Sequence, residues 1–181
     1  MSEQNKKLES IKKSSNVAMI LAKIAKIICI VGAAACLVSG IGLIAFHDTV
    51  NEELHRAEAE GKIDLNDLIL EFNVGGLTMS LDDSGRISET MGLFLLLTNI
   101  FAIVFAVLLH FTGRVFKKIK ESDSPFQKSI LKDMIVVFVL ITLLALQSSI
   151  LIGVMVGFSL WCIYSVFDYG CELQRQSDET L

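Results

Sequence analysis

The uncharged stretch 134–167 constrains this chain more than any other feature. It is 34 residues long and contains no Asp, Glu, Lys, Arg, His or Pro. As one straight helix it would run about 51 Å, whereas the hydrocarbon core of a bilayer is about 30 Å thick. Its one polar interruption, Gln147-Ser148-Ser149, lies near the middle. We expect a helical hairpin that enters a membrane and returns, with spans at 130–147 and 150–168; one long bent helix is the open alternative.

Two further apolar runs, 27–46 and 91–112, are each long enough to cross a bilayer once. The chain has 181 residues and is 52% hydrophobic, which is too apolar for an ordinary soluble domain of this length. No segment has the pattern of a removable signal peptide. The expected fold class is therefore an all-α integral membrane protein with four transmembrane helices.

The distribution of charge predicts how these spans are oriented. The segment 1–26 and the loop 113–132 each carry six basic residues, whereas 47–90 carries 11 acidic residues and only three basic ones. Because cytoplasmic flanks are enriched in Lys and Arg, we expect both termini in the cytoplasm and the acidic loop outside. The tail 169–181 then lies inside. For 1–26 we favour an ordinary basic flank over a surface helix that binds anionic lipid.

The acidic loop 47–90 is patterned enough to predict a small α+β region. Asp48 to Glu60 has helical spacing and is followed by Gly61, while 68–72 and 77–81 alternate as two short strands do. Asp82 and Asp83 offer oxygens to a divalent cation, but without a known loop spacing we favour solvated surface charge.

Small residues recur every fourth position in two of the spans. Gly32, Cys36 and Gly40 form one ridge, and Ser149, Gly153 and Gly157 form another. Small residues at this spacing allow helices in lipid to approach closely. We expect the two ridges to pack on each other within one molecule; dimerisation is the alternative.

Polar residues within the spans predict structure, and no chemistry. An amide inside a span usually bonds to a neighbouring helix, which we expect of Asn99, whereas His110 is interpreted as interfacial because the other spans carry no charge to complete a proton relay. The four cysteines do not suit a secreted disulfide framework, and no catalytic, metal or phosphate motif is present. We predict no enzyme, no cofactor, no metal site and no direct nucleic-acid binding.

The inner loop and the tail together form a candidate docking surface for a cytoplasmic partner. Loop lysines and tail acids are expected to attract each other, so that the tail folds back on the loop; a frayed, solvated tail is the alternative. The residues assigned to this surface are Lys117, Lys118, Lys120, Pro125, Phe126, Gly170, Glu172, Leu173, Gln174, Asp178 and Thr180.

Three segments also carry a resemblance to a known family: 115–120 (Val-Phe-Lys-Lys-Ile-Lys), the Ser124-Pro125-Phe126 turn, and the C-terminal 169–181. From about 91 to 181 the chain resembles a family of small four-span bacterial membrane proteins classed as a domain of unknown function. Ser122-Asp123-Ser124 departs from the glycine commonly found before that proline. The resemblance implies a bacterial plasma membrane location. It also implies a small Xre-type helix-turn-helix regulator as a partner, because such a regulator is often encoded beside these proteins.

Three functional classes follow from these features. The first is a membrane-bound sensor or regulator that docks a cytoplasmic transcription factor, and it is the one we favour. The second is an immunity or antimicrobial-peptide-resistance protein, in which the acidic outer loop meets a cationic peptide. The third is a transporter accessory subunit, which the lack of charge within the spans weakens. The anionic lipid of the cytoplasmic face is the other expected partner, and the oligomeric state is left open.

Overall fold

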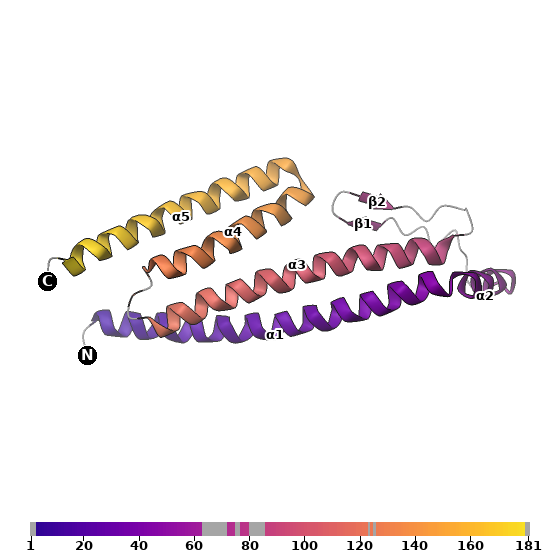
Figure 1. Cartoon of the computed structure of the whole chain (residues 1–181), viewed down its shortest axis with the longest axis horizontal. Helices are drawn as coiled ribbons and strands as arrows, with labels where there is room; N and C mark the ends of the chain where they lie inside the picture. Colours follow the sequence, from indigo (N-terminus) through magenta and orange to yellow (C-terminus); the bar gives the residue numbers. More distant parts are fainter. Residues whose placement is uncertain are drawn as a thin grey trace. The chain divides into compact units, whose positions relative to one another are not determined.

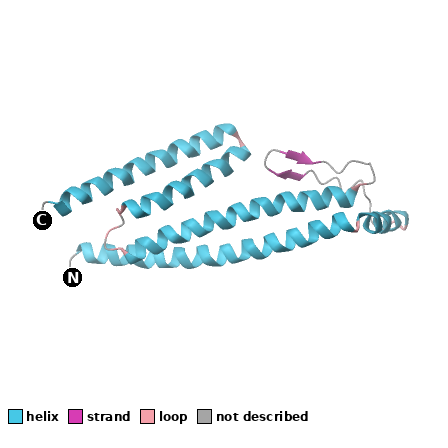
Figure 2. Cartoon of the chain, viewed as in Figure 1, coloured by secondary structure: helices cyan, strands magenta, loops and turns pink. Residues whose placement is uncertain are grey.

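The computed structural model of this chain describes residues 3–62, 72–74, 77–79, 86–122, 124 and 126–179. Five helices and a two-stranded hairpin make up the described part (Figures 1 and 2). Their bounds are α1 Glu3–Ala45, α2 His47–Ala59, β1 Phe72–Val74, β2 Leu77–Met79, α3 Ile87–Glu121, α4 Lys128–Ser148 and α5 Ile150–Glu179. The chain divides into two compact parts: residues 1–28 with 104–181 (the first part), and residues 29–103 (the second part).

Four of these helices, α1, α3, α4 and α5, are long and apolar enough to cross a membrane. Most side chains in their apolar segments point outward: Val38 is 72% exposed and Ile150 is 77% exposed. In water such surfaces would be unfavourable, but in hydrocarbon they are the expected solvent-facing side. The prediction of four long apolar helices is therefore confirmed.

The helices are longer than the predicted spans. α1 runs without interruption through the predicted boundary between 1–26 and 27–46, and α3 continues to Glu121, well into the predicted 113–132 loop. α5 likewise continues through most of the predicted tail to Glu179. Lys, Arg, Glu and Gln are good helix formers, so a helix does not end where its sequence turns polar. These helices extend beyond the predicted spans, and the membrane boundaries near 26, 112 and 168 stay predictions.

α4 and α5 form a hairpin joined by the single residue Ser149 (Figure 1). Ser149 is extended, with φ −167° and ψ 138°, and its amide donates to the Ala145 carbonyl at 3.3 Å. Its own carbonyl accepts a 2.9 Å hydrogen bond from the Gly153 amide. The stretch 134–167 is thus two helices rather than one bent helix, and the polar interruption lies where the chain turns.

The small-residue ridge of α5 faces α4. A Cβ placed on Gly153 would overlap the side chain and Cα of Leu146, and one on Gly157 would lie 3.0 Å from Thr142 Cγ2. The expectation that this ridge packs on the first span is therefore wrong. Ser149 belongs to the turn and not to the ridge.

In the second part, α1 and α3 approach closely at Gly40 and Gly92. A Cβ on Gly40 would lie 3.0 Å from the Gly92 carbonyl oxygen, whereas one on Gly32 would meet nothing within 4 Å. Of the predicted first-span ridge, Gly40 is at a helix contact and Gly32 is open, with Cys36 half-buried between them. Asn99, which is 6% exposed, donates from Nδ2 to the Ala33 carbonyl at 2.9 Å, as predicted for an amide within a span.

The acidic segment between α1 and α3 begins with the helix α2, which follows a turn at Phe46 and starts one residue earlier than predicted. α2 ends at Ala59, and Gly61 follows with φ +68°, a left-handed conformation that glycine adopts readily. β1 and β2 pair antiparallel, with Asn73 opposite Thr78, and the remaining residues of the two predicted strands, 68–71 and 80–81, lie outside the described residues. An α+β region folded as a unit stays a prediction, because 63–71, 75–76 and 80–85, including Asp82 and Asp83, lie outside the described residues.

Candidate functional site

In the first part, the segment before α4 contacts the C-terminal end of α5. The rings of Phe126 and Phe167 have centroids 5.5 Å apart. Gly170 makes room for the Phe126 ring, because a Cβ on Gly170 would lie 2.5 Å from Phe126 Cδ1. Ser124 Oγ donates to Gln174 Oε1 at 2.8 Å. We call these five residues the loop–tail cluster; they hold α5 beside the loop beyond its apolar segment.

Local bonds shape the loop that carries Ser124. Ser122 Oγ donates to the Ser124 carbonyl at 2.7 Å, and the Phe126 amide donates to Ser124 Oγ at 3.2 Å. Short hydroxyl side chains favour such turns because they offer the backbone an alternative to helical bonding. Ser124 therefore shapes the turn before α4 and also bonds the tail.

The charges of the tail pair along α5 and not with the loop. Arg175 lies 2.6 Å from Glu172 and 3.5 Å from Glu179, at helical spacings of three and four. The hydrogen bond from Arg175 lowers the pKa of Glu172, in the charged segment beyond the apolar part of the helix. The expected ion pairs between loop lysines and tail acids are absent among the described residues. Because the tail is helical, Arg175 lies closer to Glu172 and Glu179 than the loop lysines do.

The loop lysines have other partners. Lys117 Nζ lies 3.9 Å from Glu121 Oε1, and Lys120 Nζ donates to Asn16 Oδ1 at 2.9 Å. Leu173 and Asp178, also assigned to the docking surface, are exposed, whereas Pro125 and Thr180 lie outside the described residues. Aromatic and amide contacts, rather than ion pairs, therefore join this loop to the tail among the described residues.

Asp133 is the polar residue that sequence reasoning missed. It is 6% exposed, and its Oδ2 lies 2.7 Å from Lys118 Nζ and 3.4 Å from Arg114 Nε. Lys118 Nζ also donates to the Ser129 carbonyl at 2.7 Å, whereas Oδ2 itself accepts no well-formed hydrogen bond. The pairing at Oδ2 is thus mainly charge on charge, and it ties α3 to the start of α4.

A sequence signal for Asp133 did exist. It shares the helical face of Ile130, Met134 and Val137, and all four are buried. The predicted span 130–147 already contained this carboxylate, so the expectation that spans other than the second carry no charge is wrong. A buried acid on an apolar face requires a cation, and α3 supplies two.

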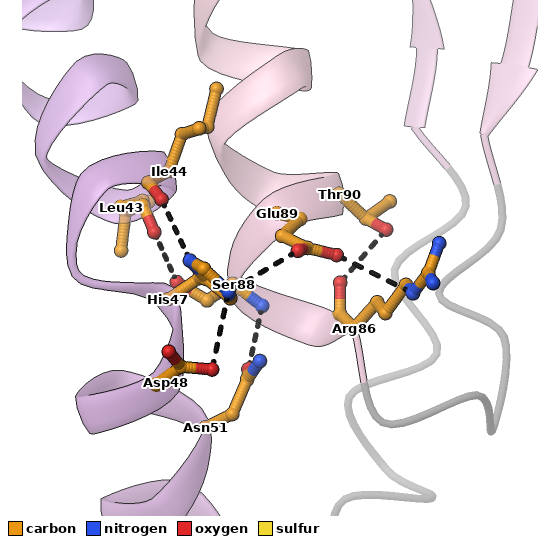
Figure 3. Close-up of polar contacts among 9 residues, drawn as sticks. All are labelled: Leu43, Ile44, His47, Asp48, Asn51, Arg86, Ser88, Glu89 and Thr90. Atoms are coloured by element: carbon orange, nitrogen blue, oxygen red, sulfur yellow. Dashed lines mark hydrogen bonds and ion pairs between the residues drawn. The ribbon is translucent and has the colours of Figure 1, made fainter.

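At the start of α3, in the second part, a polar cluster fastens the α1–α2 junction (Figure 3). Ser88 is fully buried; its Oγ donates to the Leu43 carbonyl at 2.8 Å, and its amide donates to Asn51 Oδ1 at 3.0 Å. His47 Nε2 lies 3.2 Å from Asp48 Oδ1 and 3.7 Å from Glu89 Oε1. Nothing in the sequence pattern singled out Ser88 or Asn51, because both depend on contacts between distant segments.

No group of three or more His, Cys, Asp or Glu is arranged to hold a metal within the described residues, and all four cysteines are free. No protein-family model, curated protein or solved structure matches the chain. The loop–tail cluster and the Asp133 ion pairs are therefore the features on which a functional proposal depends.

Proposed function

We propose that the protein is a multi-pass membrane sensor or regulator whose inner surface docks a cytoplasmic protein. The loop–tail cluster carries this proposal. It fastens a helix that extends past its apolar segment to Glu179, which a membrane anchor alone does not need.

A flank of this extension, beside its loop-facing residues, is available to a partner. Leu173 is 48% exposed on a segment otherwise rich in charge, where an exposed leucine gains nothing from lipid or water. Gly170 and Gln174 contact the loop, so the helical turn that carries Leu173 is held in place and does not fray. A fixed apolar residue ringed by polar ones is typical of a contact centre in protein–protein interfaces.

A helix-turn-helix regulator is the partner that the family resemblance suggests. Support for the cytoplasmic side comes from the positive-inside rule, because the basic residues flank this end of the helices. The proposed location is accordingly a bacterial plasma membrane with both termini inside.

The test compares Leu173→Lys with Val17→Lys. Val17 is 53% exposed on α1 and lies outside the loop–tail cluster, so it provides a matched apolar-to-cation change. Full-length protein in native membranes would be captured, with identification of any bound DNA-binding protein and measurement of that protein's target transcripts. We expect wild type and Val17→Lys to retain the partner and Leu173→Lys to lose it while still inserting. Equal capture by all three would contradict the proposal.

One observation favours the immunity or peptide-resistance class as the second candidate. α2 has no buried residue, and its acids Asp48, Glu52 and Glu53 are exposed. A cationic peptide would find complementary charge there. Deletion of the gene would then change survival in cationic peptide without changing transcription. A transporter accessory role gains no support from the described residues.

A further inference from the structure

A basic cavity lies between α1 and α3 within the first part. Its volume is about 380 Å³. Five cationic side chains line it, with His110 and a single acid, Glu121. The cations are Lys23 and Lys26 of α1 and Arg114, Lys117 and Lys120 of α3.

Helical spacing gathers these groups from two faces. Lys23 and Lys26 are three residues apart on α1, while His110, Arg114 and Lys117 are four and three apart on α3, so each set projects from one side of its helix. The side of the cavity where the helices meet is apolar. Buried Ala22 lies there, and a Cβ on Gly113 would be 3.8 Å from its Cβ.

The positive charge in this cavity is only partly balanced. The Glu121 carboxylate lies 3.9 Å from Lys117 Nζ, and Asp133 of α4 forms an ion pair with Arg114. Lys120 donates a hydrogen bond to the neutral side chain of Asn16. Lys23 and Lys26 make no ion pair or hydrogen bond with any residue that the structure describes. Like charges gathered in a cleft with apolar walls attract an anion more strongly than the same charges on an open surface.

We propose that this cavity binds the phosphate of an anionic membrane lipid, the phosphodiester of a phosphatidylglycerol-like headgroup. A lipid suits the site better than a free anion because exposed apolar side chains continue from it along both helices. Ile24, Ile27 and Val107 are 51%, 59% and 42% exposed, which gives the acyl chains a surface to follow. Basic pockets between transmembrane helices at the cytoplasmic side are suited to such headgroups. This assignment does not depend on the proposed protein partner.

The experiment titrates the detergent-solubilised full-length chain with dioleoyl phosphatidylglycerol or dioleoyl phosphatidylcholine and counts bound lipid by native mass spectrometry. The cavity variant is Lys23→Gln with Lys26→Gln. The control is Lys13→Gln with Lys132→Gln, two exposed lysines outside the cavity, which removes the same charge. We expect the first phosphatidylglycerol to bind the cavity variant roughly 30-fold more weakly than wild type. The control should change by less than about threefold, and phosphatidylcholine binding should not change.

Three results would overturn the proposal. Equal losses in the cavity variant and the control would show that diffuse surface charge attracts the lipid. Full displacement of phosphatidylglycerol by millimolar inorganic phosphate would assign the cavity to a small free anion. Unchanged binding in a cavity variant with wild-type circular dichroism would place the lipid elsewhere. If the double variant does not fold, Lys26→Gln against Lys132→Gln makes the same comparison, with an expected loss of about fivefold.

Discussion

Replacement of Gly92 by alanine should weaken the packing of α1 on α3. The new Cβ would lie 2.9 Å from the Gly40 carbonyl oxygen and 2.7 Å from Ile44 Cγ1. The Ile44 side chain can rotate away, but the carbonyl belongs to the α1 backbone and moves only if the helix moves. Overpacking of this kind costs about 1–3 kcal/mol of unfolding free energy.

A second effect of the same substitution opposes the first. Alanine is a better helix former than glycine by up to about 1 kcal/mol, so Gly92→Ala alone mixes a gain with a loss. Gly32→Ala supplies the control, because its Cβ would meet nothing within 4 Å and only the gain applies. The difference between the two variants therefore isolates the contact, at about 1–3 kcal/mol.

The assay is thermal unfolding of the detergent-solubilised full-length chain, followed by circular dichroism and by the loss of the monodisperse peak on size exclusion. At about 2–4 °C per kcal/mol for a chain of this size, Gly92→Ala should melt roughly 2–12 °C below Gly32→Ala. If Gly92→Ala melts at or above the temperature of Gly32→Ala, the two helices do not meet at Gly92, and the reasoning fails.

Three further outcomes are expected. Asp133→Asn should lower stability by about 1–3 kcal/mol, less than a fully buried pair because both cations are partly exposed, and thermal unfolding with and without added salt measures it. Asn99→Leu should lower the unfolding free energy by about 1 kcal/mol through loss of the hydrogen bond to the Ala33 carbonyl. The control, Ile100→Leu at an exposed neighbouring position, should leave the thermal unfolding temperature unchanged. In a chain without its native cysteines, an impermeant thiol reagent applied to intact cells should label Glu58→Cys and spare Ser177→Cys; label at 177 would reverse the proposed position of the tail.

The long elements were predictable from sequence because the bilayer sets a length that few other environments require. The hairpin turn was predictable because Gln147-Ser148-Ser149 is the one run of consecutive polar residues in the apolar stretch 134–167. The bond of Asn99 to a neighbouring helix was predictable because an amide in lipid must be satisfied. Each of these predictions requires only the chemistry of a residue and of the solvent around it, without knowledge of which residues it contacts.

The partners of residues were harder to predict than the elements. A run of small residues shows that a helix face is approached but not by which helix, so Gly153 and Gly157 were assigned to the wrong neighbour. Asp133 was overlooked because it adjoins Lys132 at the edge of an apolar run, where charge is ordinary. The tail acids were assigned to distant lysines, although Arg175 lay within one helical turn.

The single-residue connection at Ser149 also bears on how the protein is assembled. The contact of Gly157 with Thr142 spans 15 positions of sequence, whereas the Asn99–Ala33 bond spans 66. Loop closure costs more entropy as the separation grows, and contacts between near neighbours form sooner. α4 and α5 can therefore pair soon after both have been synthesised. The contacts of α1 with α3 can form only after the much longer intervening segment and α3 itself have been synthesised.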